Sequence, residues 1–298
     1  MKRSRVKQFM TMSEDKIIGM FKELPRSMVL PTPYGDAVYI KGHRDDAVLL
    51  VSHTDTVWGD SKIKISQDGP VLSSSCDKTG IGADDRAGIA ALWALKDTGH
   101  SILIVPEEET GCKGSGYVSD NYKLFFDEQY AIQFDRKGGN DLVFYDCGNV
   151  DFENYLLEHY TQYDTAMGSF SDICTLCPAL GIAGVNISIG FRNEHTSRET
   201  LNLDEWFRTV NKTRKLLSVY CPDFEYIESV YNYGYLGGSS FKTDSVFRDE
   251  DHGTGWLYED ERTVFCHGCQ NTQILLKIED CCPACGLGEE YLVDQADY

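Results

Sequence analysis

The stretch DAVLLVSHTD, residues 46–55, decides the fold of this chain. Its first part is a continuous apolar run, which is typical of a strand covered on both faces of a sheet. Its end carries His53 and Asp55, and the twofold period of a strand places both side chains on the same side. A carboxylate there can accept the imidazole N–H and orient the other ring nitrogen toward a metal. The stretch therefore predicts a buried strand that ends in a metal ligand.

Further apolar runs alternate with helical patterns along the chain. Expected strands cover residues 37–40, 101–105, 129–134 and 184–189. Expected helices cover residues 14–24, 85–95, 152–159 and 203–219, the first of them begun by a capping box at Thr11 and Glu14. The alternation predicts an α/β fold in which a mostly parallel mixed sheet has helices on both faces. Ligands of such sheets bind outside the carboxyl ends of the strands.

Five candidate ligands stand at or near these strand ends. They are His53, Asp84 in GADDRAG, Glu109 in PEEETG, Asp135 in QFD and His195 in NEHTSRET. Two dications bring four positive charges, which three carboxylates and one bridging hydroxide cancel while the histidines stay neutral. A nearly neutral cluster can be buried at low cost. The set therefore predicts two divalent metals and metal-assisted hydrolysis.

Each motif alone also has an ordinary structural interpretation. His53 and Asp55 could form a surface turn, and Asp84 and Asp85 could only cap a helix. The run 107–109 could be an exposed acidic loop. The convergence of all of them on strand ends favours one shared site, in which Glu108 could take a proton and deliver it to a leaving amine.

Composition narrows the function classes. The chain has 298 residues and a formal net charge of −19, which disfavours binding to nucleic acid or to an anionic membrane. No run reaches the roughly 20 apolar residues of a membrane helix. The basic residues near Met1 precede no apolar segment, so we expect no secretory signal. With 11 cysteines and no such signal, reduced thiols and a cytoplasmic location are expected.

The last part of the chain differs in amino-acid composition from the rest. We expect a di-metal hydrolase domain over residues 1–226, a linker or irregular excursion over 227–263 and a zinc-ribbon-like tail over 264–298. The tail would hold one structural zinc, and its four candidate ligands are Cys266, Cys269, Cys282 and Cys285. Cys281 or His267 could replace one of them. Because few basic residues stand near it, nucleic-acid binding is disfavoured, and we expect either a protein contact or packing against the hydrolase domain.

The motifs HTDT, GADDRAG, PEEETGCKGS, QFD and NEHTSRET together resemble those of the co-catalytic di-zinc exopeptidase superfamily. This group contains leucyl-type aminopeptidases, tripeptidases and the acylase/carboxypeptidase relatives. The match covers roughly residues 45–217. The resemblance implies that the five candidate ligands hold two divalent metals, expected to be zinc, with Asp84 between both. It also implies that Asp55 orients His53 and that Glu108 is the general base.

Three details refine the resemblance. Asp135 resembles the aminopeptidase and tripeptidase members, since many acylase and carboxypeptidase members carry Glu there. Only about 60 positions separate Asp135 from His195, so we expect no inserted lid domain and favour a monomer. Ser171 and Asp172 resemble a Ser-Asp pair of aminopeptidase members. Asp172 is therefore a candidate substrate contact, although a helix N-cap explains it equally well.

Three functions remain open from the sequence. The first is an aminopeptidase in which a metal-bridging hydroxide attacks a peptide bond near a free terminus. The second is an amidohydrolase that deacylates N-acyl amino acids with the same site. The third is an inactive binding or adaptor protein that works through its zinc ribbon. The filled ligand and base positions argue against an inactive site, and the absence of a Gly-x-Ser-x-Gly elbow disfavours a serine hydrolase.

Overall fold

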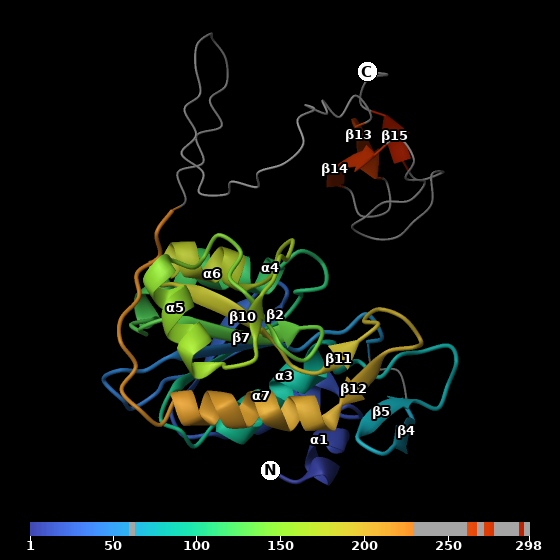
Figure 1. The fold of residues 1–298 in the computed structure, drawn as a ribbon, viewed down its shortest axis with the longest axis horizontal. Helices are drawn as coiled ribbons and strands as arrows, with labels where there is room; N and C mark the ends of the chain where they lie inside the picture. Colours follow the sequence, from blue (N-terminus) through green and yellow to red (C-terminus); the bar gives the residue numbers. More distant parts are fainter. Residues whose placement is uncertain (60–62, 229–260, 267–270, 277–291, 295–298) are drawn as a thin grey trace. The chain divides into compact units, whose positions relative to one another are not determined.

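The computed structural model describes residues 1–59, 63–228, 261–266, 271–276 and 292–294. The chain divides into two compact units, Met1–Asn232 and Tyr233–Tyr298. The first unit contains an eight-stranded mixed sheet, a four-stranded antiparallel sheet and helices that pack on the larger sheet (Figure 1). None of the helices in the described residues is both long and apolar enough to span a membrane.

The centre of the larger sheet consists of four neighbouring parallel strands. In spatial order they are β6 (Ser101–Val105), β3 (Leu49–His53), β7 (Ala131–Arg136) and β10 (Gly184–Ser188). The flanking strands are β1 (Ser27–Thr32) and β2 (Gly35–Ile40) on one side, and β8 (Asp141–Val143) and β9 (Asp164–Thr165) on the other. Every residue of β3, β6 and β10 is buried, because helices cover both faces of the sheet. The predicted fold class is confirmed.

Helices form a layer on each face of this sheet (Figure 1). One layer consists of α1 (Arg3–Phe9), α2 (Glu14–Lys22), α3 (Ala83–Leu95), α5 (Val150–His159) and α7 (Leu203–Leu216). The other consists of α4 (Lys113–Tyr122) and α6 (Ile173–Leu180), and the short helix η1 (Lys123–Phe125) follows α4. Trp206 of α7 is fully buried, and its indole N–H donates to the Ala87 carbonyl at 2.9 Å, so α7 is tied to α3.

The smaller sheet carries the loop of the last candidate ligand. Its strands follow the order β11 (Phe191–Arg192), β12 (Thr200–Asn202), β5 (Val71–Ser74) and β4 (Ile65–Asp68). Because β11 pairs directly with β12, the intervening loop with His195 is held at both ends. Between β7 and β10 the described chain forms only β8, α5, β9 and α6. The expected absence of an inserted lid domain at this place is therefore confirmed.

The predicted capping box at Thr11 and Glu14 is wrong. The N-cap of α2 is Ser13, whose side chain makes no capping hydrogen bond. Thr54 donates its hydroxyl to Glu14 Oε1 at 2.6 Å, and Thr11 donates to the Gln8 carbonyl at 3.0 Å. Both side chains that a capping box would require therefore make other hydrogen bonds.

The predicted zinc ribbon falls mostly outside the described residues. Cys269, Cys282 and Cys285 lie there, as do the substitutes His267 and Cys281. Cys266 is the last residue of β13 (Glu261–Cys266), which pairs antiparallel with β14 (Asn271–Leu276) and β15 (Leu292–Asp294). The ribbon therefore stays a prediction.

Asp46, at the entrance to β3, gives a stability prediction. Arg44 donates to both of its carboxylate oxygens at 2.7 Å, and the Cys221 N–H donates to Oδ2 at 2.9 Å. Asp46→Asn should lower the free energy of unfolding by about 1–3 kcal/mol, because an amide nitrogen cannot accept these bonds. Urea unfolding at pH 7 measures the loss, with Asp45→Asn at the neighbouring exposed position as the control.

The same contact predicts the direction of a pH effect. Hydrogen bonds from Arg44 hold the pKa of Asp46 well below its usual range. A depressed folded-state pKa stabilises the protein above the ordinary value of about 4, and the contribution is lost as the pH falls further. Asp46→Asn should therefore differ less from the parent in acid than at pH 7. Equal unfolding midpoints at pH 7 would contradict this account of the contact.

Candidate metal centre

The five candidate ligands meet at the carboxyl ends of the four central strands. His53 is the last residue of β3, and Asp135 lies near the end of β7. Glu109 follows β6, and His195 lies on the loop after β11, beyond β10. Asp84 enters from the start of α3. Residues that are far apart in sequence converge here because parallel strands end at the same edge of a sheet.

Asp84 stands between two separate groups. Its Oδ1 lies 3.2 Å from His53 Nε2, and that nitrogen is also 3.5 Å from Asp135 Oδ1. Its Oδ2 lies 3.2 Å from His195 Nε2, which is 2.8 Å from Glu109 Oε2. One carboxylate therefore presents one oxygen to an imidazole–carboxylate pair on each side.

The residues fit two divalent cations. Imidazole nitrogens and carboxylate oxygens are the donors that zinc and related metals take. His53 is fully buried, and the side chains of Asp84 and Asp135 are only 10% and 8% exposed. Glu109 Oε1 is buried and has no hydrogen-bond partner among the described residues. A buried carboxylate oxygen without a partner is costly unless a cation satisfies it.

The electrostatics of the cluster also favour cations. Burial and the charge of Asp84 raise the pKa of Asp135 to about 7, and burial raises the pKa of Glu109. Hydrogen bonds to Asp84 and Glu109 raise the pKa of His195 to about 11. Burial alone would lower the pKa of His53, but contacts with the surrounding carboxylates raise it well above its usual value. Crowded carboxylates thus favour any positive charge placed among them.

Asp55 positions two parts of the site. Its Oδ1 is 3.3 Å from His53 Nδ1, so it can orient the ring whose Nε2 faces Asp84. Its two oxygens also accept the backbone N–H groups of Glu108 and Glu109, each at 3.1 Å. The single carboxylate therefore fixes the imidazole of one strand end and the acidic loop of the next.

The start of α3 separates the roles of two adjacent aspartates. Gly82 holds the N-cap in a left-handed conformation, and both aspartates have non-helical backbone angles, with a cis peptide between them. Asp85 accepts from the Gly88 N–H at 2.9 Å and from the Ser52 hydroxyl. One oxygen of Asp85 therefore accepts a backbone N–H of α3 and the other accepts from β3, while Asp84 faces the cluster.

A hydrogen-bonded layer behind Asp135 was missed by sequence reasoning. Gln133 and Ser171 donate to Asp135 Oδ2 at 3.1 and 2.9 Å, while the Asn186 side-chain oxygen accepts the Asp135 N–H at 2.9 Å. These bonds occupy one oxygen of Asp135 and leave the other toward His53. The signal in the sequence was a polar residue inside each of two buried apolar strands.

Asp172 lies in this layer rather than in the cavity. It is fully buried, and its Oδ2 accepts from Gln133 Nε2 at 3.2 Å. It occupies the N-cap position of α6, but its side chain makes no capping bond. This placement fits a residue that supports Asp135 through Gln133. A direct contact of Asp172 with substrate stays a prediction.

A cavity of about 220 Å³ opens over the cluster. It is lined by the acidic residues Asp84, Glu108, Glu109, Asp135 and Glu194, the basic residues Arg136, Lys137 and His195, and Tyr145, Ser169, Phe170 and Phe191. Phe170 is about half exposed at this cavity. The cavity therefore combines candidate metal ligands, a candidate base and an apolar wall.

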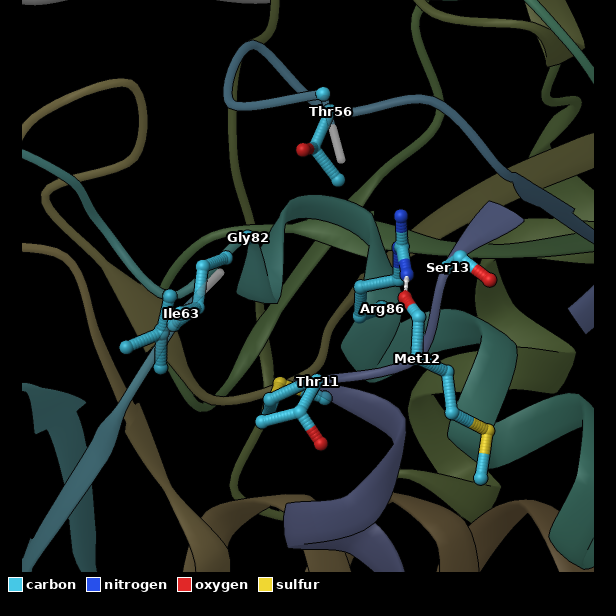
Figure 2. Close-up of a pocket in the computed structure, with 10 residues that line it drawn as sticks. Thr11, Met12, Ser13, Thr56, Ile63, Gly82 and Arg86 are labelled. Carbon is cyan, nitrogen blue, oxygen red and sulfur yellow. Dashed lines mark hydrogen bonds between the residues drawn. The ribbon is translucent and has the colours of Figure 1, made fainter. Parts of the chain in front are cut away.

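A second cavity, of about 230 Å³, lies beside the start of the GADDRAG segment (Figure 2). Arg86 points there toward the carbonyl of Met12 and donates to it, while Thr56 and Gly82 line the same space. None of the five candidate ligands lines this cavity. Arg86 thus anchors the segment after α1 to the start of α3.

Glu199 lies in the NEHTSRET motif and is buried, and the sequence alone did not indicate a role for it. Its carboxylate accepts the backbone N–H groups of Ile81, Gly82 and Asp84 at 2.9, 2.7 and 3.0 Å. It also accepts the indole N–H of Trp58 at 3.2 Å. One side chain therefore ties the backbone of Asp84 to the segment after β3 and to the loop of His195.

Glu199→Gln tests this positioning role. The amide nitrogen cannot accept an N–H, so the backbone at Asp84 should shift and zinc binding should weaken by about 10- to 100-fold, as for other supports of metal ligands. Competition with a chelator measures the affinity, and Glu158→Gln at an exposed position is the control. Hydrolytic activity that is lost at limiting zinc should return when excess zinc is supplied. An unchanged zinc affinity would show that Glu199 does not position the ligand.

Comparisons with known proteins give matches only in structure: no protein-family model matches the chain, and no curated protein matches it in sequence. Aminopeptidase PepT from Bacillus cereus has a TM-score of 0.56 at 14% identity, over 72% of this chain and 96% of that one. A tripeptidase from Staphylococcus aureus has a TM-score of 0.56 at 13% identity, over 73% and 97%. TET1 peptidase from Pyrococcus horikoshii has a TM-score of 0.54 at 14% identity, over 72% and 98%.

The chain has the fold of these peptidases. Since the identities are 13–14%, the likeness is one of architecture. It is the architecture that the resemblance to the di-zinc exopeptidase superfamily predicted, and that prediction is confirmed for the fold.

Proposed function

We propose that the chain is a metal-dependent peptidase that removes residues from a free amino terminus. The observation that carries the proposal is the position of Asp84, whose two oxygens face two different imidazole–carboxylate pairs. A single metal would need only one such pair. A carboxylate placed between two pairs fits a two-metal site. The fold shared with an aminopeptidase and a tripeptidase supports the same function.

The ligands divide into two sets in this proposal. His53 and Asp135 would hold one divalent cation, His195 and Glu109 would hold the other, and Asp84 would contact both. When bound, the cations polarise the scissile carbonyl and lower the pKa of the attacking water. The chain's own contribution is to fix the ligands, through Asp55, Glu199 and the layer behind Asp135.

Glu108 is the proposed general base. It lines the cavity beside Asp84 and Asp135, and the Asp55 carboxylate holds its backbone N–H. Its side chain contacts only the Cys112 thiol, at 3.5 Å, among the hydrogen bonds of the described residues. Burial and the charge of Asp135 raise its pKa to about 9. Two dications beside Glu108 would lower this pKa, so that the ionised carboxylate could take a proton from water and pass it to the leaving amine.

A panel of paired peptides tests the function. Short peptides with free amino termini and their N-acetylated forms are incubated with the full chain, supplied in turn with zinc, manganese and cobalt. We expect stepwise removal of amino-terminal residues from the free peptides only, detected by mass spectrometry and abolished by a chelator. Cleavage restricted to N-acyl amino acids would establish the amidohydrolase instead. Metal binding without any hydrolysis would favour the adaptor.

The tail and the assembly state belong to the same proposal. Cys266, Cys269, Cys282 and Cys285 would hold one structural zinc that resists mild chelation, because a closed four-thiolate site exchanges its metal less readily than an open catalytic one. The ribbon would then serve a protein contact. We propose a cytoplasmic monomer, although the similar TET1 peptidase can assemble into a tetrahedron or a large octahedral shell.

A further inference from the structure

A third cavity, of about 510 Å³, adjoins the one over the candidate metal centre. It shares Arg136, Lys137 and Glu194 with that cavity and extends to Arg192. The shared residues make the two cavities neighbours along one wall. A substrate held over the metal ligands could therefore reach into the second space.

The wall of this space carries three cationic side chains and two acidic ones: Arg136, Lys137 and Arg192, and Asp141 and Glu194. This is a local excess of positive charge in a chain whose formal net charge is −19. Lys137 is paired with Glu194 at 2.6 Å, and Arg192 with Glu205 at 2.5 and 3.0 Å. Lys137 and Arg192 are therefore already held in ion pairs with neighbouring glutamates.

Arg136 is the cation of this wall whose N–H donors form no hydrogen bond with neighbouring side chains. Its nearest acidic contact is from Nε to Asp141 Oδ2, at 3.5 Å, and its guanidinium donates no hydrogen bond to any of the described residues. Its side chain is 22% exposed, so it is enclosed but reachable. It directly follows Asp135 in β7, where the pairing with β10 shifts register. The shift lets both adjacent residues line the same cavity.

We propose that Arg136 anchors a subsite for a substrate carboxylate. A guanidinium presents a rigid fork of N–H donors that matches a carboxylate with two parallel hydrogen bonds. An anionic substrate also needs a local cation to approach an acidic protein. The carboxylate is either the carboxyl terminus of a di- or tripeptide or an acidic side chain. The inference rests on the proposed peptidase function and deepens it by naming the substrate class.

Matched substrate pairs test the subsite and separate its two sources. The first pair is Leu-Gly-Gly and its carboxyl-terminal amide, and the second is Glu-Gly-Gly amide and Leu-Gly-Gly amide. The parent should prefer the carboxylate member of one pair by about 10- to 100-fold in kcat/KM, mostly through KM, as expected for a charged hydrogen-bonded pair. A preference in the first pair identifies the carboxyl terminus, and one in the second identifies the side chain.

Variants assign the preference to Arg136. Arg136→Gln should bring the two members of the pair to within about threefold of each other, and Arg136→Lys should keep part of the preference because it retains the charge without the fork. Arg198→Gln removes the same charge from an exposed position and should keep the full preference. Each preference is a ratio within one variant, so partial misfolding does not alter it.

A binding measurement keeps this test independent of turnover. Glycylglycine should bind the metal-loaded protein at least about tenfold more tightly than its amide by calorimetry, or glutamate amide more tightly than glutamine amide, and Arg136→Gln should remove the difference. Such a difference without peptide cleavage would retain the subsite and reject the peptidase. Equal binding within both pairs, or an unchanged difference in Arg136→Gln, would overturn the subsite whatever the activity.

Discussion

Glu108→Gln is expected to keep both catalytic metals and to lose about 100- to 10,000-fold in kcat, the usual contribution of a positioned general base. The substitution preserves the shape of the side chain and its backbone contact with Asp55. It removes the group that would accept the proton, because an amide does not take a proton near neutral pH. Steady-state hydrolysis of a free tripeptide measures kcat, and plasma mass spectrometry measures the metals.

The matched control for Glu108 stands next to it. Glu107→Gln makes the same change of charge in the same loop, but Glu107 accepts from the Thr110 hydroxyl at 2.7 Å and does not line the cavity. Its kcat should stay within about threefold of the parent, as expected for a surface change away from the chemistry. If Glu108→Gln cleaves peptides as fast as Glu107→Gln, the assigned base is wrong.

Asp84→Asn should remove at least one of the two metals and lower kcat/KM by more than about 100-fold, a larger effect than the loss of a residue that only supports a ligand. The substituted amide would offer one acceptor oxygen where the Asp84 carboxylate offers two, and it would lack the negative charge that offsets the cations. Each imidazole–carboxylate pair contacts one oxygen of that carboxylate. Metal content after gel filtration, together with activity at saturating zinc, measures the loss.

An exposed aspartate on the preceding segment serves as the control for Asp84. Asp77→Asn changes the net charge equally and should bind as many catalytic metals as the parent. Retention of two catalytic metals and full activity in Asp84→Asn would mean that the carboxylate between the two pairs is not a ligand. The proposed site would then have no residue that contacts both metals.

The central strands could be predicted from sequence because they are buried on both faces. Runs such as 101–105 need apolar residues at nearly every position, and this pattern differs from that of exposed segments. The candidate ligands could be found because His53, Asp135 and their neighbours are polar residues at the ends of such runs. The chain's topology then brings them together without further information.

Two of the helices that escaped prediction, α4 and α6, have sequences that contradict the usual preferences. α4 contains Gly114 and Gly116, and α6 contains Pro178. These residues disfavour isolated helices, so tertiary packing decides the outcome. The two helices pack against each other on one face of the sheet, where Val118 and Leu176 are buried in the same core cluster.

The residues that hold the ligands could not be read from local patterns. Glu199 contacts the backbone of Asp84 across 115 positions, and Asn186 contacts Asp135 across 51. A buried polar residue in a strand indicates only that some partner exists. Which partner it meets depends on the register of the sheet and on the path of the loops, and both become visible only in the folded chain.

The central claim is that Asp84 and the four candidate ligands around it hold two cations. Anomalous diffraction at the zinc edge, from crystals of the zinc-loaded full chain, tests it most directly. We predict two peaks about 3.5–4 Å apart, one on each side of the Asp84 carboxylate, next to His53 and His195 respectively. A single peak at this place, or peaks only elsewhere in the chain, would contradict the claim.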